Sequence, residues 1–309
     1  MNLNTSKKQI LVGLDNSGKT SLSLALKNNY TKIGLTKPTY LVDRGVFKYL
    51  NYDIIQHDFG GQRKYLITYL KEPGKYFNET DVAAYVIDIQ DTERFDESLD
   101  YFKDMLASFD DLDLNPEIWI LFHKAEKYLI EGDEEELVVV ESLKKRIKEI
   151  NKKRFSISFE ITSIYDRWSV VRAFGKIFNA LYPKNEKLDA TMKELADTIN
   201  ASLVSIIDDN VLVVGTYSRD KAQEDLLSYT VPHLYKIKTD LDEKSGHKDL
   251  VTLQKGGFGY AFVDLHASPV KLYVLAIGIK NFTTEALLIQ EIESFTYKIL
   301  NALDLLEGE

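Results

Sequence analysis

Cysteine is absent from the sequence, and so are long apolar runs. Without cysteine the chain can form no disulfide, no thiolate metal site and no cysteine nucleophile. No apolar stretch approaches the roughly 20 residues that cross a bilayer. The start is polar, residue 2 is Asn2 rather than the glycine that myristoylation needs, and the last residues carry no prenylation box. We therefore expect a cytoplasmic protein without an intrinsic membrane anchor, which partners could recruit to a membrane surface.

Positive charge is in short supply, because 48 Asp and Glu outnumber 39 Lys and Arg and give a net charge of −9. No global attraction to nucleic acid is expected from that balance. A hydrophobic fraction of 44% with 28% charged residues is typical of a globular protein with proper cores. The 309 residues allow two domains of ordinary size. We place them at residues 1–183 and 184–309.

One motif organises the rest of the chain. Residues 13–20 read Gly-Leu-Asp-Asn-Ser-Gly-Lys-Thr, with an apolar run at 9–12 before them and a helical pattern at 21–27 after them. The glycines let backbone N–H groups turn around phosphate oxygens at the start of the new helix. Lys19 would reach the β- and γ-phosphates, and the Thr20 hydroxyl would ligate Mg2+. The alternative is a Gly/Ser-rich turn without a ligand.

Strands and helices alternate after this loop. Residues 30–39 read as a loop, and two extended runs at 42–50 and 52–58 could form a hairpin around Asn51. Further along we expect buried strands at 81–88, 117–124 and 156–162, and helices at 96–106, 134–151 and 169–181. This alternation favours an α/β fold with a mainly parallel sheet and helices on both faces. Ligands of such sheets bind at the carboxyl ends of the strands, where the motifs lie.

The motifs occur in the order found in small GTPases, and residues 9–182 resemble that family. Residues 13–20 are similar to the Arf phosphate loop, and the run Asp58-Phe59-Gly60-Gly61-Gln62 resembles the switch II motif of Arf and Rag proteins. Thr39 occupies the switch I position. His123-Lys124-Ala125-Glu126 takes the base-recognition place, and Thr162-Ser163-Ile164 the last guanine loop. The His-Lys opening and the Thr-Ser-Ile run are most similar to the Rag branch.

The resemblance implies a site for GTP or GDP with Mg2+. The metal ligands would be Thr20, Thr39 and Asp58, the last through a water, and Gln62 would orient the attacking water as the catalytic residue. The Gly61 N–H would bond the γ-phosphate and release switch II once that phosphate leaves. The nucleotide would be bound by residues of all the motifs, namely Asp15, Asn16, Ser17, Gly18, Lys19, Thr20, Ser21, Gly61, His123, Lys124, Glu126, Ser163 and Ile164.

An arginine finger is not recognisable in cis. Arg44 and Arg63 lie near the two switches in the sequence, but exposed charges are the simpler interpretation of both. Intrinsic hydrolysis should therefore be slow, on the order of 10⁻⁴ to 10⁻² per second. An activating protein and an exchange factor are the expected regulators.

The chain departs from the family pattern at two positions. Glu126 stands where the family usually has the Asp that binds the guanine N1–H and exocyclic amine, and its extra methylene could weaken guanine selectivity. Alternatively, the backbone adjusts and restores the contact, or Glu126 is only the solvated start of a loop. His57 stands where relatives carry Trp, and we interpret it as a packed histidine outside the site.

Other polar clusters read as structural. The acidic run at 132–136 suits the first turn of a helix better than a metal site, because acidic side chains complement the helix dipole. His233, His247 and His266 are scattered singly and are taken as surface or core residues rather than metal ligands.

The second domain contains no further phosphate motif. We expect a helix at 188–201, strands at 203–207 and 211–217 joined by a turn at 208–210, and a helix at 220–241 bent or broken near Pro232. Strands at 250–254, 260–265 and 271–277, with Gly256 and Gly257 between the first two, and a helix at 283–306 would follow. This order predicts an α+β fold. It resembles the roadblock (longin-like) domain that follows the nucleotide domain in Rag GTPases, which implies pairing through an edge strand and a helix. A monomeric appendage is the alternative.

Three functions remain in competition. The first is a Rag-like GTPase switch that binds GTP or GDP with Mg2+, slowly hydrolyses GTP and controls partner binding by its loop conformation. The second is a dimerising scaffold with a bound nucleotide and little turnover. The third is an Arf-like trafficking GTPase that partners recruit to membranes. The sequence leaves homodimer and heterodimer equally open.

Overall fold

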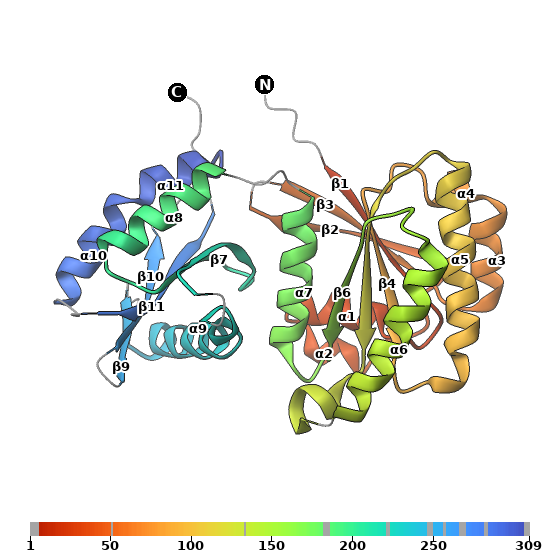
Figure 1. The fold of residues 1–309 in the computed structure, drawn as a ribbon, viewed down its shortest axis with the longest axis horizontal. Helices are drawn as coiled ribbons and strands as arrows, with labels where there is room; N and C mark the ends of the chain where they lie inside the picture. Colours follow the sequence, from red (N-terminus) through yellow and green to blue (C-terminus); the bar gives the residue numbers. More distant parts are fainter. Residues whose placement is uncertain are drawn as a thin grey trace. The chain divides into compact units, whose positions relative to one another are not determined.

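The computed structural model describes residues 6–50, 52–132, 134–181, 186–220, 223–245, 250–255, 258–265, 270–280 and 284–305. The chain divides into two compact units, Met1–Leu181 and Tyr182–Glu309, which Figure 1 shows as two separate sheets with their own helices. The turn expected at Asn51, the Gly256–Gly257 pair, His247 and His266 lie outside the described residues.

The first unit is built on a six-stranded sheet in the order β2-β3-β1-β4-β5-β6. The strands are β1 (Lys7–Val12), β2 (Val42–Tyr49), β3 (Tyr52–Phe59), β4 (Val82–Asp88), β5 (Glu117–His123) and β6 (Ile157–Thr162). Only the β2–β3 pair is antiparallel, and the other neighbours run parallel. The predicted α/β fold with a mainly parallel sheet is confirmed.

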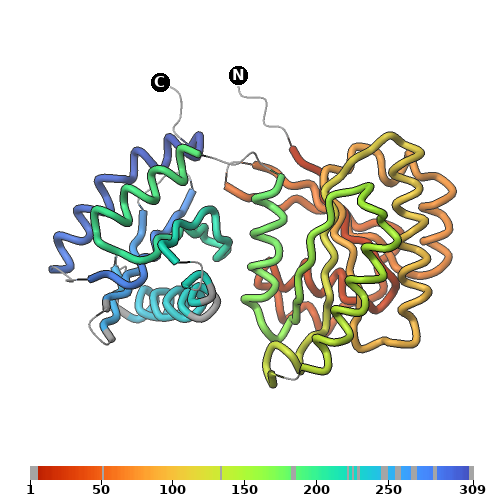
Figure 2. Tube along the Cα trace, viewed as in Figure 1, coloured from red at the N-terminus to blue at the C-terminus, as the bar shows by residue number. Residues whose placement is uncertain are grey.

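Helices cover both faces of this sheet (Figure 1). On one face lie α1 (Lys19–Leu26), α2 (Tyr30–Ile33) and α7 (Arg167–Ala180). Figure 2 shows that α1 and α7 run side by side although most of the unit separates them in the sequence. The other face carries α3 (Arg63–Lys71), α4 (Pro73–Tyr76), α5 (Phe95–Asp111) and α6 (Glu134–Asn151). The loop expected at 30–39 was therefore partly wrong, because its first residues form α2.

The core explains why β4 and β5 read as unbroken apolar runs. Both lie inside the sheet, and six of the seven residues of β4 are buried. Strands of a parallel sheet that is covered on two faces show no polar alternation. Beside them the rings of Phe59, Tyr69 and Phe77 pack together, with centroids 4.7 Å and 5.9 Å from that of Phe59. This aromatic cluster fixes the end of β3, where Asp58 lies.

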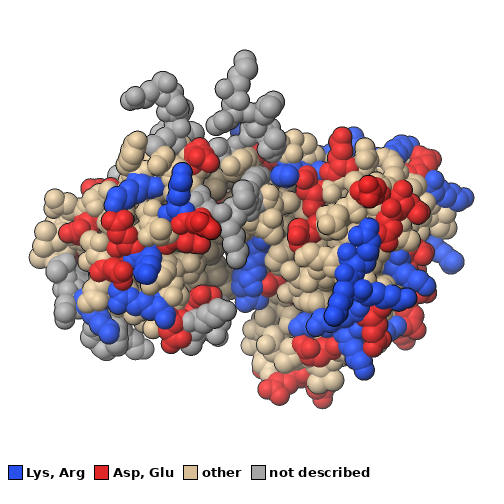
Figure 3. All heavy atoms as spheres, turned by 45° about the horizontal axis from the view of Figure 1, so that its top comes forward, with Lys and Arg blue, Asp and Glu red and all other residues tan. Residues whose placement is uncertain are grey.

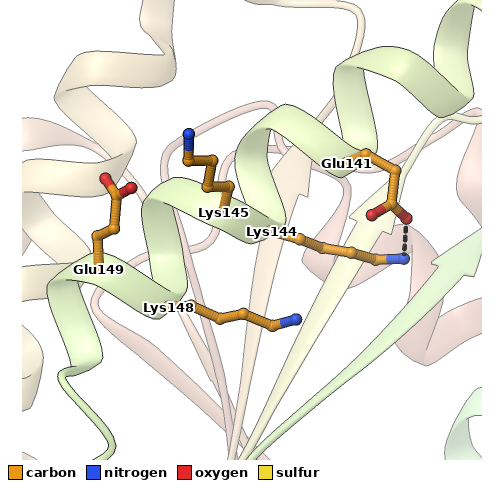
Figure 4. A pocket seen from close by; sticks show the side chains of 5 residues that line it. All are labelled: Glu141, Lys144, Lys145, Lys148 and Glu149. Atoms are coloured by element: carbon orange, nitrogen blue, oxygen red, sulfur yellow. Dashed lines mark hydrogen bonds and ion pairs between the residues drawn. The ribbon is translucent and has the colours of Figure 1, made fainter.

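Basic side chains flank the edge strand β6. Figure 3 shows Lys and Arg gathered on one face of the first unit, and Figure 4 shows the lysines and glutamates that line a shallow groove along α6, namely Glu141, Lys144, Lys145, Lys148 and Glu149. The ammonium groups of Lys144 and Lys148 lie 6.0 Å and 5.6 Å from the centre of the Phe159 ring on β6. Charged side chains over an edge strand discourage its pairing with another chain.

The second unit is an antiparallel sheet in the order β8-β7-β11-β10-β9. Its strands are β7 (Leu203–Asp208), β8 (Val213–Ser218), β9 (Leu250–Lys255), β10 (Phe258–Leu265) and β11 (Leu272–Ile279). The helices α8 (Glu186–Thr198), α10 (Glu285–Ser294) and α11 (Thr296–Ala302) lie apart from α9 (Asp225–Ser245) (Figure 1). The predicted α+β order of helix, two strands, helix, three strands and helix is confirmed.

Two helix predictions in this unit were wrong in detail. The helix expected at 220–241 starts at Asp225 in α9 and is not broken at Pro232, which lies inside it, while a bend there stays a prediction. The single helix expected at 283–306 is two helices, because Phe295 separates α10 from α11. In the described parts of the chain, no helix is long and apolar enough to span a membrane.

Candidate nucleotide site

The loop between β1 and α1 requires its glycines. Gly13 and Gly18 have φ angles of 144° and 94°, in the region that favours glycine. A Cβ atom on Gly13 would lie 2.3 Å from the Val86 carbonyl oxygen, and one on Gly18 would lie 2.3 Å from Cδ2 of His123. The backbone therefore turns back tightly before α1, with no room for side chains at these two positions.

Lys19 points into this loop. It is 5% exposed, and its Nζ donates to the carbonyl oxygens of Gly13 at 3.0 Å and Leu14 at 2.6 Å. It also lies 3.3 Å from the Ser17 hydroxyl, which is itself buried. Burial lowers the pKa of Lys19 to about 8. A bound anion would favour the charged ammonium and raise that pKa.

Three oxygen-bearing side chains meet beside Lys19. The Thr20 hydroxyl donates to Asp58 Oδ2 at 2.5 Å and lies 3.0 Å from the Thr39 hydroxyl. These residues come from the start of α1, the end of β3 and the segment before β2. Asp58 is 7% exposed, and its Oδ1 is buried without a hydrogen-bond partner. Burial raises the pKa of the Asp58 carboxyl, although the Thr20 bond opposes the shift.

This oxygen cluster suits a hard cation. Mg2+ prefers oxygen ligands and commonly takes only one or two carboxylates, with waters and phosphates completing its shell. An unpartnered buried carboxylate oxygen is the kind of group that a cation would satisfy. Among the described residues, no group of three or more His, Cys, Asp and Glu side chains is arranged to hold a metal ion. The three predicted metal ligands therefore lie together, as a set with a single carboxylate.

The same cluster opens into a cavity of about 330 Å³. Its walls combine the phosphate loop, the segment before β2 and the residues after β3 (Asp15, Asn16, Gly18, Lys19, Thr20, Ser21, Thr36, Lys37, Pro38, Thr39, Phe59, Gly61 and Gln62). Sequence reasoning selected most of these residues and missed the 36–38 segment. Among these walls, Lys19 and the hydroxyl groups of Thr20 and Thr39 are polar groups that can bind phosphate oxygens.

Residues after β3 contact the phosphate loop directly. The Gly61 carbonyl oxygen accepts from the Asp15 N–H at 2.9 Å, and a Cβ on Gly61 would lie 2.1 Å from the Asp15 nitrogen. Only glycine allows this approach. Gln62 stands at the start of α3, and its Oε1 is buried without a hydrogen-bond partner. A polar atom that is buried and unpaired at the cavity edge is available to a water or a ligand.

His123, at the end of β5, contacts the end of β6 and the loop that follows β1. Its Nδ1 lies 3.1 Å from the Thr162 hydroxyl at the end of β6, and its ring lies against Gly18. The ring is 1% exposed, and burial lowers the pKa of His123 to about 4, so the imidazole is neutral at pH 7. The next residue, Lys124, donates to Asp88 Oδ2 at 2.7 Å.

Glu126 is fixed at both carboxylate oxygens. The Ser163 hydroxyl donates to Oε1 at 2.9 Å, and the Gln90 carboxamide donates to Oε2 at 2.9 Å. Glu126 is half-buried, and Ile164 is half-buried in the turn that follows Ser163. The interpretation of Glu126 as merely the solvated start of a loop was therefore wrong.

Sequence reasoning missed Gln90 and Arg94. Arg94 donates to the Asp15 carboxylate at 2.8 Å and to the Asp15 carbonyl oxygen at 3.3 Å. Both residues follow β4, whose carboxyl end lies at the same edge of the sheet as the phosphate loop. The strand-end rule that selected Asp58 and His123 could have selected this segment as well. By contrast, Arg44 and Arg63 are exposed, and His57 is half-buried on β3 beside β2.

A model of the Gtr1/RagA G protein conserved region matches residues 8–232. The chain belongs to this family. The match runs through the nucleotide unit and into the second unit, so the sequence resemblance to Rag GTPases is confirmed.

Individual relatives of this Gtr1/RagA family are distant. The chain is 24% identical to GTP-binding protein GTR1 of Saccharomyces cerevisiae over 219 residues, covering 69% of each chain. It is 23% identical to Ras-related GTP-binding protein B of Rattus norvegicus over 312 residues, covering 88% of this chain and 79% of the relative. It is 41% identical to ADP-ribosylation factor-like protein 5 of Caenorhabditis elegans over only 88 residues. Among solved structures, the Arl6 BBS3 small GTPase of Trypanosoma brucei covers 57% of this chain and 98% of its own, with 17% identity and a TM-score of 0.45.

Proposed function

We propose that this member of the Gtr1/RagA family is a molecular switch that binds GTP or GDP with Mg2+ and slowly hydrolyses GTP. The observation that carries the proposal is the buried, unpaired Oδ1 of Asp58 beside the hydroxyls of Thr20 and Thr39. The names of two relatives describe them as GTP-binding proteins, which supports the choice of nucleotide.

Thr20, Thr39 and Asp58 would hold the metal. When bound, Mg2+ would neutralise phosphate charge and so favour phosphoryl transfer. Lys19 would add its positive charge from inside the loop. The burial that lowers its pKa also places the ammonium where a phosphate would be its natural counter-ion.

Gln62 is the residue to which we assign the hydrolytic step. Its buried Oε1 has no hydrogen-bond partner, and it borders the phosphate cavity. The carboxamide would accept a hydrogen bond from the attacking water and hold it in line with the phosphate. Arg44 and Arg63 are exposed, and Arg94 is engaged by Asp15. The proposal therefore keeps a slow intrinsic rate and an arginine supplied by an activating protein.

The switch would act through two segments that meet. Thr39 precedes β2 and Gly61 follows β3, and both line the phosphate cavity. Beside them the rings of Tyr40 and Tyr65 lie 5.7 Å apart, edge to face, which joins the two segments. Loss of the γ-phosphate would loosen both together and change the surface offered to partners. We keep the cytoplasm as the expected location, with membrane recruitment left to partners.

The test is to identify the nucleotide that the purified protein carries and to follow its hydrolysis. Mass spectrometry of released nucleotide should find GDP or GTP, and Gln62→Leu should shift the bound pool from GDP to GTP. A variant at the exposed neighbour, Lys64→Ala, is the matched control and should leave that ratio unchanged. Absence of a guanine nucleotide, or no phosphate release from GTP with no effect of Gln62→Leu, would contradict the proposal.

We also propose that the second domain, residues 184–309, pairs with a second domain of the same fold. The edge strand β9 exposes Leu253 by 47%, and α9, which packs beside β9, exposes Ile237 by 43% and Leu241 by 40%. An open edge strand with apolar side chains on the adjoining helix is suited to extending the sheet into another copy. The partner would be a second copy of the chain or a paralogue.

Molar mass in solution tests this pairing. The expected result is a dimer of about twice 35.4 kDa, or a monomer that becomes a dimer when a paralogue is added. Leu241→Glu should weaken the dimer, whereas Tyr297→Glu on α11, which packs against α8 and exposes this side chain by 68%, should not. If the protein is a monomer and pairs with no paralogue, the second domain does not dimerise and is instead a monomeric appendage of the first domain.

A further inference from the structure

We infer that Gln90 is a positioning residue for base selectivity, because its carboxamide fixes the longer Glu126 side chain for the recognition of guanine. The inference rests on the proposed function, since it concerns the base end of the same nucleotide site. A glutamate has one more rotatable bond than an aspartate. Unless that bond is fixed, the carboxylate samples orientations that do not meet a planar base.

Gln90 reaches Glu126 from the end of β4. Its Nε2 donates to the Lys124 carbonyl oxygen at 2.8 Å and to Glu126 Oε2 at 2.9 Å. A carboxamide has two N–H donors, so these two bonds use both and set the plane of the group. The contact to Lys124 anchors Gln90 on the backbone of the loop itself. The orientation of the Glu126 carboxylate is therefore fixed relative to the loop that follows β5.

Ser163 holds the opposite oxygen from the end of β6. Its hydroxyl donates to Glu126 Oε1 at 2.9 Å and accepts from the Tyr165 N–H at 3.1 Å. The Ser163 N–H in turn donates to the Ser169 hydroxyl at 3.0 Å, which fixes the turn. With one oxygen held from β4 and the other from β6, rotation of the carboxylate would break one of the two bonds.

The carboxylate retains capacity for a ligand. Each carboxylate oxygen has two lone pairs, and each is used once by the protein. Glu126 forms no ion pair with any described Lys or Arg, while the neighbouring Lys124 is paired with Asp88 instead. The remaining lone pairs of Glu126 can accept two adjacent donors. Guanine presents such a pair, N1–H and the exocyclic amine, whereas adenine has an acceptor at N1.

The experiment compares affinities for GDP, IDP and ADP, since IDP keeps N1–H and lacks the exocyclic amine. Gln90→Leu removes both donors at similar size. Gln90 is exposed, so water competes for its bonds, and we expect the variant to weaken GDP binding about fivefold, the loss for an ordinary hydrogen bond. IDP binding should weaken less, so that the ratio of GDP to IDP affinity falls. Glu93→Gln, an exposed neighbour after β4, is the matched control and should change neither.

A double-mutant cycle separates positioning from folding. In Glu126→Asp the shorter side chain no longer reaches Gln90, so adding Gln90→Leu should have little further effect on the selectivity ratio. Equal losses for GDP and IDP in Gln90→Leu, or no loss at all, would overturn the inference. Equal wild-type affinities for GDP and IDP would also overturn it while leaving GTP hydrolysis intact. Failure of the wild type to prefer GDP over ADP would refute the proposed function instead.

Discussion

Arg94 neutralises the one acidic residue of the phosphate loop. Its guanidinium donates to the Asp15 carboxylate at 2.8 Å and to the Asp15 carbonyl oxygen at 3.3 Å. Glu97 holds the same guanidinium through Nε at 2.8 Å, and these two carboxylates raise the pKa of Arg94 further above its ordinary value. Asp15 also lines the phosphate cavity. A carboxylate in that place would repel a triphosphate more than a diphosphate unless it is paired.

Arg94→Ala should therefore lower the ratio of GTP to GDP affinity. Asp15 is part-exposed, so we expect a modest change of about fivefold, the effect of a partly screened charge pair. Asp15→Asn in the same chain should restore the ratio, because no unpaired charge remains. Isothermal titration with GDP and a non-hydrolysable GTP analogue measures both affinities. Glu97→Gln, which leaves the Asp15 contact intact, is the control, and an equal loss for both nucleotides would contradict the prediction.

Chelation of Mg2+ should speed the release of bound GDP. If Thr20, Thr39 and Asp58 hold the metal, metal and nucleotide stabilise each other's binding, and removing the metal should raise the GDP release rate about tenfold. Thr20→Ala removes one ligand and should shrink this response to chelator. Ser23→Ala is the control, because that hydroxyl bonds Gln56 one turn further along α1. A full chelator response in Thr20→Ala would exclude Thr20 as a ligand.

His123 should make stability depend on pH between about 4 and 6.5. Burial lowers the pKa of His123 to about 4 in the folded chain, against about 6.5 when unfolded. Between these two pH values His123 is protonated in the unfolded chain and neutral in the folded chain. Stability is therefore complete above pH 6.5 and falls as the pH drops to 4, by about 3 kcal/mol from this residue.

Urea unfolding of wild type and His123→Asn at pH 7 and pH 5 measures this contribution. The variant should lose less stability between the two pH values, since an amide does not titrate. His233→Asn at an exposed position of α9 should behave like wild type. If wild type and His123→Asn lose the same stability, the buried imidazole is not the titrating group.

Gly18→Ala should destabilise the first unit by about 3 kcal/mol, through both backbone strain at φ 94° and overlap with the His123 ring. Gly34→Ala is its counterpart, because a Cβ there would meet nothing within 4 Å and the φ angle is −66°. That change should be neutral or slightly stabilising. Thermal unfolding followed by circular dichroism compares the two, and similar melting temperatures would contradict the argument.

Local motifs were readable because each depends on neighbouring residues. The glycine spacing around Lys19 and the apolar run of β4 are properties of short segments, and they predicted the fold class and the set of loops at one sheet edge. Contacts across the sheet were not readable in this way. Arg94 meets Asp15 across 79 positions and Gln90 meets Glu126 across 36, so both pairs depend on tertiary packing.

The helix boundaries failed for a related reason. Pro232 removes one backbone donor, yet α9 continues through it, because Val231 and Leu234 are buried on either side of it and packing outweighs the local penalty. At the end of the chain the apolar spacing continues through Phe295, although the backbone there separates α10 from α11. The spacing of apolar residues indicates which face of a helix is buried. It does not indicate where the helix is interrupted, as it is at Phe295.

The imidazole of His123 acts as a rigid spacer. Its ring touches Gly18 on the phosphate side and Thr162 on the base side, and a flat, neutral, buried ring can neither stretch nor rotate without breaking one of these contacts. The spacing between the phosphate loop and the proposed base-recognition residues is thus fixed by packing within the first unit. If the proposed site is correct, a bare phosphate or a free nucleoside would engage only one of these two sets of residues. An intact nucleotide would engage both and should therefore bind more tightly than either piece alone.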